Sequence, residues 1–440
     1  MSVNIDRSCV KWGPVWLAPG ISKSNMWTLV YAAFFTIGLL TFVGVGTPYV
    51  LSAILKIPPE QQGAVSGNLV FWTEIAALAL FGPVGILVDR YGRKPLYAFG
   101  FVLMGLGYGL YPTAGDIFEL TIYRVIYAAG IATVTGVLAT VVTDYPQEAT
   151  RGRMVAIVGF MNGTGIAVLN AILGGVPKRL VDRGFDEVTA GQYAHWIVTA
   201  LCLVSAVVVA IGLKGGLPQQ SHEKPPVLKI ARDALKAAMN PRIALAYSAA
   251  FIARGDLVIL GTFLTLWGKN AGLDAGLDIA EASRRGTLVF VFAQSASLLW
   301  IGAAIFLLDR FNRVKALAAC MALAAVGYLS MGFVTNPIDP LDLPLIFLLG
   351  IGQISAFLGS QSLVGQEAPI GERGAILGGF NMSGAIGILF CSVVGGQMFD
   401  SISPKAPFVL VGALNLIVFV LCLIVMKYAP GRDPDRASTA

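Results

Sequence analysis

A ten-residue stretch between two apolar runs decides the fold: Gly85-Ile86-Leu87-Val88-Asp89-Arg90-Tyr91-Gly92-Arg93-Lys94. It places one acidic and three basic side chains where an apolar run ends, as at the point where a membrane helix meets water. A degraded second copy, Asp309-Arg310-Phe311-Asn312-Arg313, ends another apolar run 220 residues later. A charged boundary repeated at this distance indicates a duplicated membrane chain.

A second pair of segments keeps the same spacing. Gln147-Glu148-Ala149 with Arg153 recurs as Gln366-Glu367-Ala368 with Arg373, and the offset stays within one residue of the first. Two halves in the same orientation imply two parallel bundles that are related by an axis along the membrane normal. In such a fold the ligand site lies between the bundles near the middle of the membrane.

Twelve apolar runs surround these boundaries, each long enough for a helix to cross the hydrocarbon. They lie near residues 27–54, 66–88, 96–113, 117–143, 154–174, 194–213, 243–268, 286–308, 315–334, 343–366, 374–398 and 406–427. The predicted fold class is therefore an all-α membrane protein, with twelve transmembrane helices in two pseudo-symmetric six-helix bundles.

The expected division of the chain follows these runs. It comprises a cytoplasmic N-terminal arm (1–26), an N-terminal bundle (27–213), a cytoplasmic linker (214–242), a C-terminal bundle (243–427) and a cytoplasmic tail (428–440). Within the linker, residues 227–239 mix apolar and charged side chains, which predicts either an amphipathic helix on the inner membrane surface or a solvated linker.

Composition excludes several classes of protein. The chain is 56% apolar and 13% charged, with a mean hydropathy of +0.74, which leaves too few charges to cover a water-soluble surface. A soluble enzyme, a secreted disulfide scaffold and a nucleic-acid binder are therefore excluded. With only two histidines, and with four of five cysteines inside apolar runs, we expect no cofactor and no metal site.

Orientation follows from the distribution of the 31 Lys and Arg residues, most of which fall in the termini and the even-numbered loops. Because basic loops stay in the cytoplasm, both termini are predicted to be cytoplasmic in a multi-pass protein of the plasma membrane, the inner membrane if the source is bacterial. The net charge of +6 then reflects loops that face an anionic leaflet. The lipid bilayer is the expected partner, and we expect a monomer.

At residues 85–94 the sequence resembles the major facilitator superfamily, whose signature G-x-L-x-D-R-x-G-R-K is matched at every specified position. The resemblance implies a secondary transporter that works by alternating access. It also implies a gating role for Asp89 and Arg93, which would hold the cytoplasmic ends of the two bundles together. Their partners would be Asp144, Glu148 or a facing helix end. Arg90 and Lys94 could instead only set topology. The gating set implied by both copies is Gly85, Asp89, Arg90, Gly92, Arg93, Asp309, Arg310 and Arg313.

Two further family patterns are incomplete. The fourth-span pattern R-x-x-Q-G-x-G keeps Arg124 and Gly130, but Tyr127 and Ala128 depart from it. In the family this arginine often takes part in proton coupling, and the resemblance implies this role for Arg124. The departures at Tyr127 and Ala128 weaken that assignment without removing it. The fifth-span pattern of drug antiporters, G-P-x-x-G-G, is absent, which counts against a drug:proton antiporter.

Four ionisable residues remain inside the expected spans: Glu74, Arg124, Arg254 and Asp256. A charge at the bilayer centre costs about 2.5 to 3.5 kcal/mol even on the lower scales, so such residues normally face partners or a wet cavity. By resemblance, both arginines would line the central cavity. Two guanidinium groups there favour a carboxylate, phosphate or sulfate. In the alternative, Arg124 pairs with Glu74, and Arg254 pairs with Asp256 or with a group on the tenth span.

The remaining candidates are a carboxyl pair and four neutral side chains. Asp256 lies two residues from Arg254 and therefore faces another side of the helix. Glu74 and Asp256 are candidate proton carriers, because removal from water favours the neutral form of a carboxyl group. Four polar residues could bind substrate or instead link helices, and they are Tyr127, Tyr247, Gln353 and Gln361.

The predicted function is secondary active transport of a small organic solute, with an organic anion as the sharper hypothesis and protons as the coupling ion in symport. One alternative is an exporter of amphipathic drugs or lipids. Another, from a different class, is a non-transporting assembly or sensor protein on the same scaffold. An enzyme is not expected, because no nucleophile, base and orienting group occur together at recognisable spacing.

Overall fold

The computed structural model describes residues 5–6, 8–215, 227–369 and 372–429. Parts of the predicted arm (1–26), linker (214–242) and tail (428–440) lie outside the described residues, as do the side chains of residues 227–231 and Asp309.

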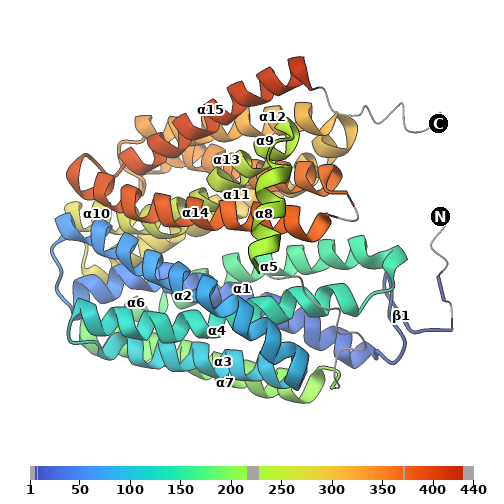
Figure 1. The fold of residues 1–440 in the computed structure, drawn as a ribbon. Helices are drawn as coiled ribbons and strands as arrows, with labels where there is room; N and C mark the ends of the chain where they lie inside the picture. The colour runs from blue at the N-terminus through green and yellow to red at the C-terminus, as the bar shows by residue number, and fades with distance from the viewer. Residues whose placement is uncertain (1–4, 7, 216–226, 370–371, 430–440) are drawn as a thin grey trace. The chain divides into compact units, whose positions relative to one another are not determined.

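The described chain is almost wholly helical (Figure 1). The first half contains the hairpin strands β1 (Lys11–Trp12) and β2 (Val15–Trp16), then α1 (Lys23–Tyr49), the π-helix η1 (Val50–Ile54), α2 (Gln62–Tyr91), α3 (Arg93–Leu110), the 3₁₀ turn η3 (Tyr111–Thr113), α4 (Ile117–Asp144), α5 (Arg151–Leu173), α6 (Val176–Val181) and α7 (Glu187–Gly212). The second half contains α8 (Val227–Ala237), α9 (Pro241–Val258), the π-helix η5 (Ile259–Leu264), α10 (Thr265–Asp274), α11 (Ile279–Arg310), α12 (Arg313–Ser330), α13 (Leu343–Glu367), α14 (Arg373–Ser401) and α15 (Ala406–Tyr428).

Eleven helical segments among the described residues are long and apolar enough to cross a membrane, and they coincide with eleven expected spans. The remaining expected span, residues 96–113, coincides with α3 and η3. The twelve-helix prediction is therefore confirmed at the level of the fold.

Several expected spans are shorter than the helical runs, and the difference matters most at the end of the seventh span. The seventh span was expected to end at residue 268, but the helical run Pro241–Asp274 continues through η5 and α10. Lys269, which the sequence placed in a loop, is therefore inside this span and has no exposed surface. The set of four intramembrane ionisable residues was incomplete for this reason.

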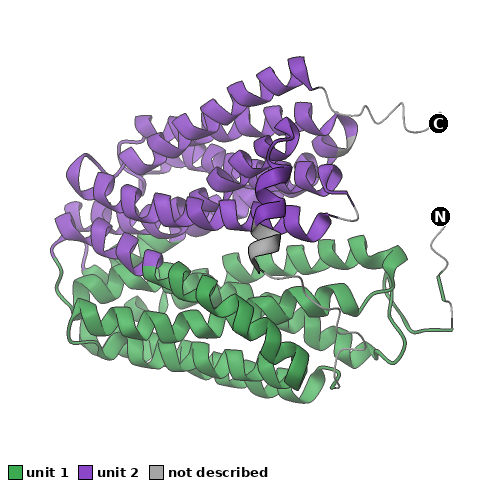
Figure 2. Ribbon diagram, in the orientation of Figure 1, with its two compact units in different colours: residues 1–57, 72–222, 279–287 green, residues 58–71, 223–278, 288–440 purple. Residues whose placement is uncertain are grey.

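The chain forms two compact units, which are described separately (Figure 2). Unit 1 contains residues 1–57, 72–222 and 279–287, and unit 2 contains residues 58–71, 223–278 and 288–440. In unit 1, α1 packs on α5, and α3 packs on α4 and α7. In unit 2, α9 packs on α14, and α12 packs on α13 and α15. The same pairing scheme in both units is the structural form of the repeat seen in the sequence.

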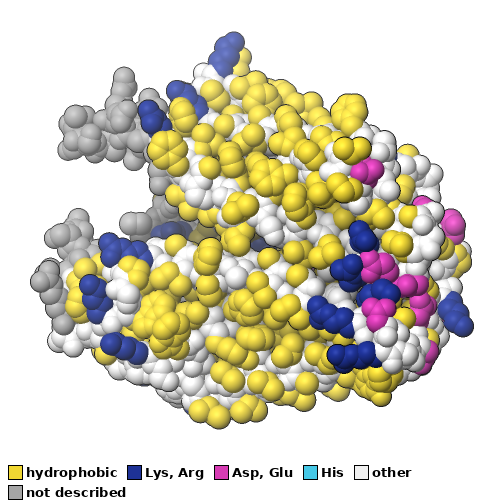
Figure 3. Space-filling model, turned by 180° about the vertical axis from the view of Figure 1, so that it is seen from behind, with side chains coloured by type: hydrophobic (Ala, Val, Ile, Leu, Met, Phe, Trp, Pro, Cys, Tyr) yellow, Lys and Arg dark blue, Asp and Glu magenta, His cyan; other side chains and the backbone are white. Residues whose placement is uncertain are grey.

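The surface of the protein fits a lipid environment. Apolar side chains cover most of the face in Figure 3, and acidic side chains gather at one edge of it. Large apolar side chains are widely exposed, including Leu299 and Ile211 at 76% each and Phe118 at 73%. In water such a surface would drive aggregation, whereas hydrocarbon tails solvate it.

The linker forms the expected amphipathic helix as α8, which contacts α14 and runs across its direction (Figure 1). Its predicted place on the inner membrane surface stays a prediction.

The start of α2 packs inside unit 2 against α14. A Cβ atom at Gly67 would lie 2.0 Å from the Ser392 carbonyl oxygen, so the two helices touch through their backbones. The carboxylate of Asp400 then accepts hydrogen bonds from the backbone N–H groups of Gly63 (2.9 Å) and Ala64 (2.7 Å). Because the first N–H groups of a helix have no partner within it, Asp400 satisfies the N-terminus of α2.

The two copies of the signature differ for a backbone reason. Gly92 precedes α3 with φ 86° and ψ 167°, a region that only glycine adopts readily. Its counterpart Asn312 has φ −50°, and its side chain accepts a hydrogen bond from Val314 N at 2.9 Å, so it caps α12. The second copy can therefore lack this glycine, whereas the first cannot.

Replacing Gly92 with alanine is expected to destabilise the protein by about 1 to 3 kcal/mol, because the Cβ atom is disfavoured at this backbone conformation. The matched control is Asn312→Gly, which removes a side-chain cap, and the loss of this cap is expected to cost a few tenths of a kcal/mol. Thermal unfolding of the purified variants in detergent measures both. Equal melting temperatures for Gly92→Ala and the wild type would contradict the assignment.

Candidate functional site

Arg124 lies inside unit 1 on α4, with 3% of its surface exposed. Its Nε donates a hydrogen bond to the Thr73 hydroxyl at 2.9 Å. Its Nη1 donates to the hydroxyls of Thr47 at 3.1 Å and Tyr111 at 3.3 Å. These groups come from α2, α1 and η3, so the packing of four elements creates the site. Hydroxyl groups solvate a guanidinium but leave its charge in place.

Aromatic rings complete the surroundings of Arg124. The ring centroids of Tyr111 and Tyr127 each lie 5.8 Å from its Cζ, within the range of a cation–π contact. The Tyr127 hydroxyl donates to the Leu40 carbonyl at 2.6 Å. His195 stacks on Tyr111 with centroids 5.8 Å apart, and its Nδ1 lies 2.9 Å from the Gly191 carbonyl oxygen. The guanidinium is therefore held in a fixed orientation by rings as well as hydroxyls.

The charge of Arg124 is not balanced inside its site. Among the described residues, its hydrogen-bond and ring partners are all neutral. Glu74, the partner in the alternative hypothesis, is half-buried beside Thr73. A buried cation with neutral partners retains a cost of about 2.5 to 3.5 kcal/mol, which an anion can offset. Anion binding by Arg124 stays a prediction.

Arg254 is half-buried inside unit 2 on α9. Its Nη2 donates to the Asn381 side-chain oxygen at 3.0 Å, and its stem packs so closely on Gly384 that a Cβ there would lie 2.5 Å from Arg254 Cγ. Tyr247 lies two turns earlier on the same face, and its hydroxyl donates to the Ala234 carbonyl of α8 at 3.5 Å. Helix α14 thus positions the arginine.

Asp256 faces a different side of α9, as its spacing from Arg254 predicts. It has no exposed surface, and neither carboxylate oxygen has a hydrogen-bond partner among the described residues. Its surroundings include Tyr328, whose hydroxyl donates to the Asp256 backbone carbonyl at 3.3 Å. An ion pair with Arg254 is therefore not formed in this structure.

The other predicted substrate residues make contacts between helices. Gln353 on α13 is 3% exposed, and its Oε1 accepts a hydrogen bond from Ser297 of α11 at 3.3 Å. Tyr127 similarly ties α4 to α1 through the Leu40 carbonyl. Gln361 is half-buried on α13. Substrate binding by these three residues stays a prediction, and the contacts of Gln353 and Tyr127 fit interhelical links.

The signature motif forms an ion pair inside unit 1. Arg93 Nη2 lies 2.6 Å from Asp144 Oδ2, which joins the start of α3 to the end of α4. Asp144 is one of the partners expected for this arginine, but the role of the motif as a latch stays a prediction. In the first copy of the motif, Gly85 and Asp89 lie within α2, and Arg90 Cζ lies 5.4 Å from the Tyr91 ring centroid. In the second copy, Arg310 Cζ lies 5.8 Å from the Phe306 ring centroid, and Arg313 donates a hydrogen bond to the Leu308 carbonyl.

The sequence analysis missed the three hydroxyl partners of Arg124 and the buried Lys269. Thr47, Thr73 and Tyr111 are neutral and far apart in sequence, so a search for charges within spans passes over them. Lys269 was missed because the seventh span was expected to end at residue 268, whereas α10 continues to Asp274. Its Nζ donates to the Gln62 side-chain oxygen.

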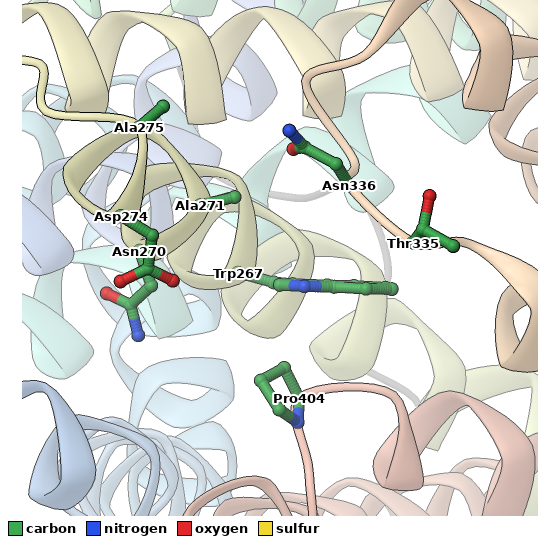
Figure 4. Close-up of a pocket in the computed structure, with 8 residues that line it drawn as sticks. All are labelled: Trp267, Asn270, Ala271, Asp274, Ala275, Thr335, Asn336 and Pro404. Carbon is green, nitrogen blue, oxygen red and sulfur yellow. The ribbon is translucent and has the colours of Figure 1, made fainter.

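A cavity of about 320 Å³ lies in unit 2 at the end of α10 (Figure 4). The Trp267 ring forms one wall, with Asn336 across from α10. The lining residues are Trp267, Asn270, Ala271, Asp274, Ala275, Thr335, Asn336 and Pro404. This set contains none of the predicted site residues.

The chain is similar to known proteins over almost its whole length. The model of the Major Facilitator Superfamily matches residues 29–369 and 286–439. Magnetosome protein MamH of Paramagnetospirillum magneticum is 30% identical over 396 residues, which cover 88% of this chain and 89% of MamH. A probable inorganic phosphate transporter 1-3 of Oryza sativa subsp. japonica is 32% identical over 147 residues, but these are only 32% of this chain and 26% of that protein.

The fold also matches a solved structure. The nucleoside transporter NupG superposes with a TM-score of 0.73 at 14% identity, covering 92% of this chain and 100% of the NupG chain. At this identity the likeness concerns the fold alone. The family model and MamH carry the assignment, and the chain belongs to the Major Facilitator Superfamily.

Proposed function

We propose that the chain is a secondary transporter for a small solute that carries a carboxylate or phosphate group. Family and fold make it a membrane transporter rather than an enzyme. The observation that supports an anionic solute is Arg124, a buried cation whose partners are all neutral among the described residues. Transport is by alternating access across the plasma membrane, with both termini in the cytoplasm.

The chemistry of the Arg124 site suits an oxyanion. A guanidinium offers a planar fork of donors that matches carboxylate and phosphate oxygens. The hydroxyls of Thr47 and Tyr111, which lie 2.9 Å apart, can rotate and donate to an oxyanion as well as accept from Arg124. The partial match to a phosphate transporter is consistent with this solute class.

Thermal unfolding of the purified protein tests the proposal. Inorganic phosphate, sulfate and succinate are added separately, with glucose as the neutral control. At about 100 times its dissociation constant, a specific ligand stabilises the folded state by about 2.7 kcal/mol, so at least one oxyanion should raise the melting temperature clearly. If none of the oxyanions acts differently from glucose, the anionic solute is ruled out.

Proton coupling is assigned to Asp256, with Glu74 as the second candidate. A carboxyl group buried inside a protein without a hydrogen-bond partner is held more readily as the neutral acid than as the anion. Asp256 meets this description among the described residues. It can carry a proton if the conformational cycle exposes it to water.

Replacing Asp256 with asparagine is expected to abolish proton-driven accumulation while solute exchange continues, because asparagine keeps the shape of a neutral carboxyl but cannot release a proton. Uptake and counterflow into proteoliposomes separate the two activities. Glu74→Gln is the parallel variant. Unchanged proton-driven uptake in both variants would refute coupling through these residues.

A second candidate function comes from the relative MamH, a magnetosome protein whose name specifies no solute. A non-transporting assembly or sensor protein on this fold would bind a ligand without moving it. Ligand-induced stabilisation without flux would identify this case. An exporter of amphipathic drugs or lipids would instead show broad competition among apolar compounds and would tolerate Arg254→Ala.

A further inference from the structure

The N-terminal hairpin docks on the loop between α4 and α5 inside unit 1. Strands β1 and β2 pair antiparallel, and the chain after them forms a bridge between Leu17 and Pro146. Two backbone hydrogen bonds of 2.8 Å flank the bridge, from Ala18 N to the Tyr145 carbonyl and from Gln147 N to that of Trp16. Leu17 has no exposed surface. We call residues 11–18 the arm hairpin and residues 145–153 the receiving loop.

Side chains of the receiving loop strengthen this contact. Gln147 Nε2 donates to the carbonyls of Asp6 and Leu17, at 3.0 Å each, and its Oε1 accepts from Asp6 N at 2.9 Å. Arg153 Nη1 donates to the Pro14 carbonyl at 3.0 Å. The loop directly follows Asp144, the partner of Arg93 in the signature motif. The receiving loop therefore connects the arm hairpin directly to Asp144, the residue that pairs with Arg93.

The outer side of the arm hairpin is basic and aromatic. Lys11 and Lys23 are exposed, and Lys11 Nζ lies 5.6 Å from the Trp16 ring centroid. Trp12 packs edge-on against Trp27 in the first turns of α1, with centroids 5.2 Å apart, and Trp27 is 62% exposed. Exposed tryptophans beside lysines, next to the end of a membrane span, are typical of the membrane–water interface. Lysines at that level attract anionic lipid.

Two acidic groups, Asp6 and Glu148, lie near this surface. Asp6 accepts hydrogen bonds from the Ser8 side chain at 2.6 Å and the Ser8 backbone at 2.9 Å, which lower its pKa. Glu148 forms an ion pair with Arg151 at 2.6 Å. Asp6 keeps its negative charge, but the two exposed lysines of the arm outnumber it and leave the surface positive.

We propose that the arm hairpin, with Lys23 and Trp27, binds the headgroups of anionic lipids and thereby holds the receiving loop in place. The lipid composition of the leaflet then influences the segment that positions Asp144 against Arg93. This inference uses the predicted cytoplasmic location of the arm, and it does not depend on the identity of the transported solute.

Hydrogen–deuterium exchange of the full chain in lipid nanodiscs tests the proposal. One set of nanodiscs contains phosphatidylcholine alone, and the other contains an equal mixture of phosphatidylcholine and phosphatidylglycerol. Exchange in the receiving loop is expected to be slower in the anionic nanodiscs. Lys11→Gln with Lys23→Gln should remove this difference, since each lysine near an anionic surface contributes about fivefold to binding.

Two further variants separate lipid binding from loop docking. Lys427→Gln is the matched control, because Lys427 is an exposed lysine 5.5 Å from the Tyr428 ring centroid at the end of α15, in unit 2. It should leave the lipid effect intact. Gln147→Ala removes side-chain contacts of the loop and should speed exchange there in both lipids. Equal loop exchange of the wild type in both nanodiscs, or a lipid effect that survives in the double lysine variant, would overturn the proposal.

Discussion

Replacing Arg124 with glutamine is expected to lower affinity for the anionic solute by about a hundredfold or more, while the protein stays folded. The loss is large because a buried, hydrogen-bonded charge pair is worth about 2 to 5 kcal/mol when one partner is removed. The free energy of unfolding is expected to rise or stay unchanged, since the variant no longer buries a charge with neutral partners. Binding by thermal shift and uptake into proteoliposomes measure both effects.

Two comparisons make the Arg124 result specific. Arg124→Lys keeps the charge but loses the fork that reaches Thr73 through Nε and Thr47 through Nη1, so affinity should fall partway. Arg183→Gln removes an exposed arginine from the same unit and should leave binding unchanged. Wild-type affinity in Arg124→Gln would mean that this site does not hold the anion.

Replacing Gly387 with alanine is expected to destabilise unit 2 by about 3 kcal/mol or more, which is the upper range for overpacking a core. A Cβ at this position would lie 1.8 Å from the Phe251 carbonyl oxygen, so α9 and α14 would have to separate. Gly165→Ala has the same effect in unit 1, where the Cβ would lie 2.1 Å from the Phe34 carbonyl oxygen. Both contacts are with backbone atoms, which no rotamer change relieves.

Each of these glycines has a control on its own helix. Among the described residues, alanine at Gly374 of α14 or at Gly159 of α5 would meet nothing within 4 Å. Because alanine favours helix by about 0.5 to 1 kcal/mol over glycine, these variants should melt at or above the wild-type temperature. If Gly387→Ala and Gly374→Ala proved equally stable in detergent, the close contact of α9 and α14 would be wrong.

The fold could be predicted because its signals are local. The charged boundary at Asp89 and Arg93 marks a helix end, and its copy at Arg310 and Arg313 marks the equivalent end in the second half. The close-packed glycines follow the same symmetry, since Gly165 meets α1 in unit 1 and Gly387 meets α9 in unit 2. A duplication that preserves both boundaries and contacts is visible in a single sequence.

The site was only partly predictable because its partners are non-local. Arg124 stood out as a charge in an apolar run, but nothing in the sequence links it to Thr47, Thr73 and Tyr111. Those contacts depend on how α1, α2 and η3 pack against α4. Likewise, the spacing of Arg254 and Asp256 predicted that they face apart, but the sequence does not indicate that Asp256 lacks a hydrogen-bond partner among the described residues.

The most direct test of an anion carrier is uptake of radiolabelled inorganic phosphate, sulfate and succinate into proteoliposomes under an inward proton gradient. At least one of these anions is expected to accumulate above its external concentration, and a protonophore or Arg124→Gln is expected to prevent the accumulation. Folded wild-type protein that takes up none of the three faster than protein-free liposomes would contradict it.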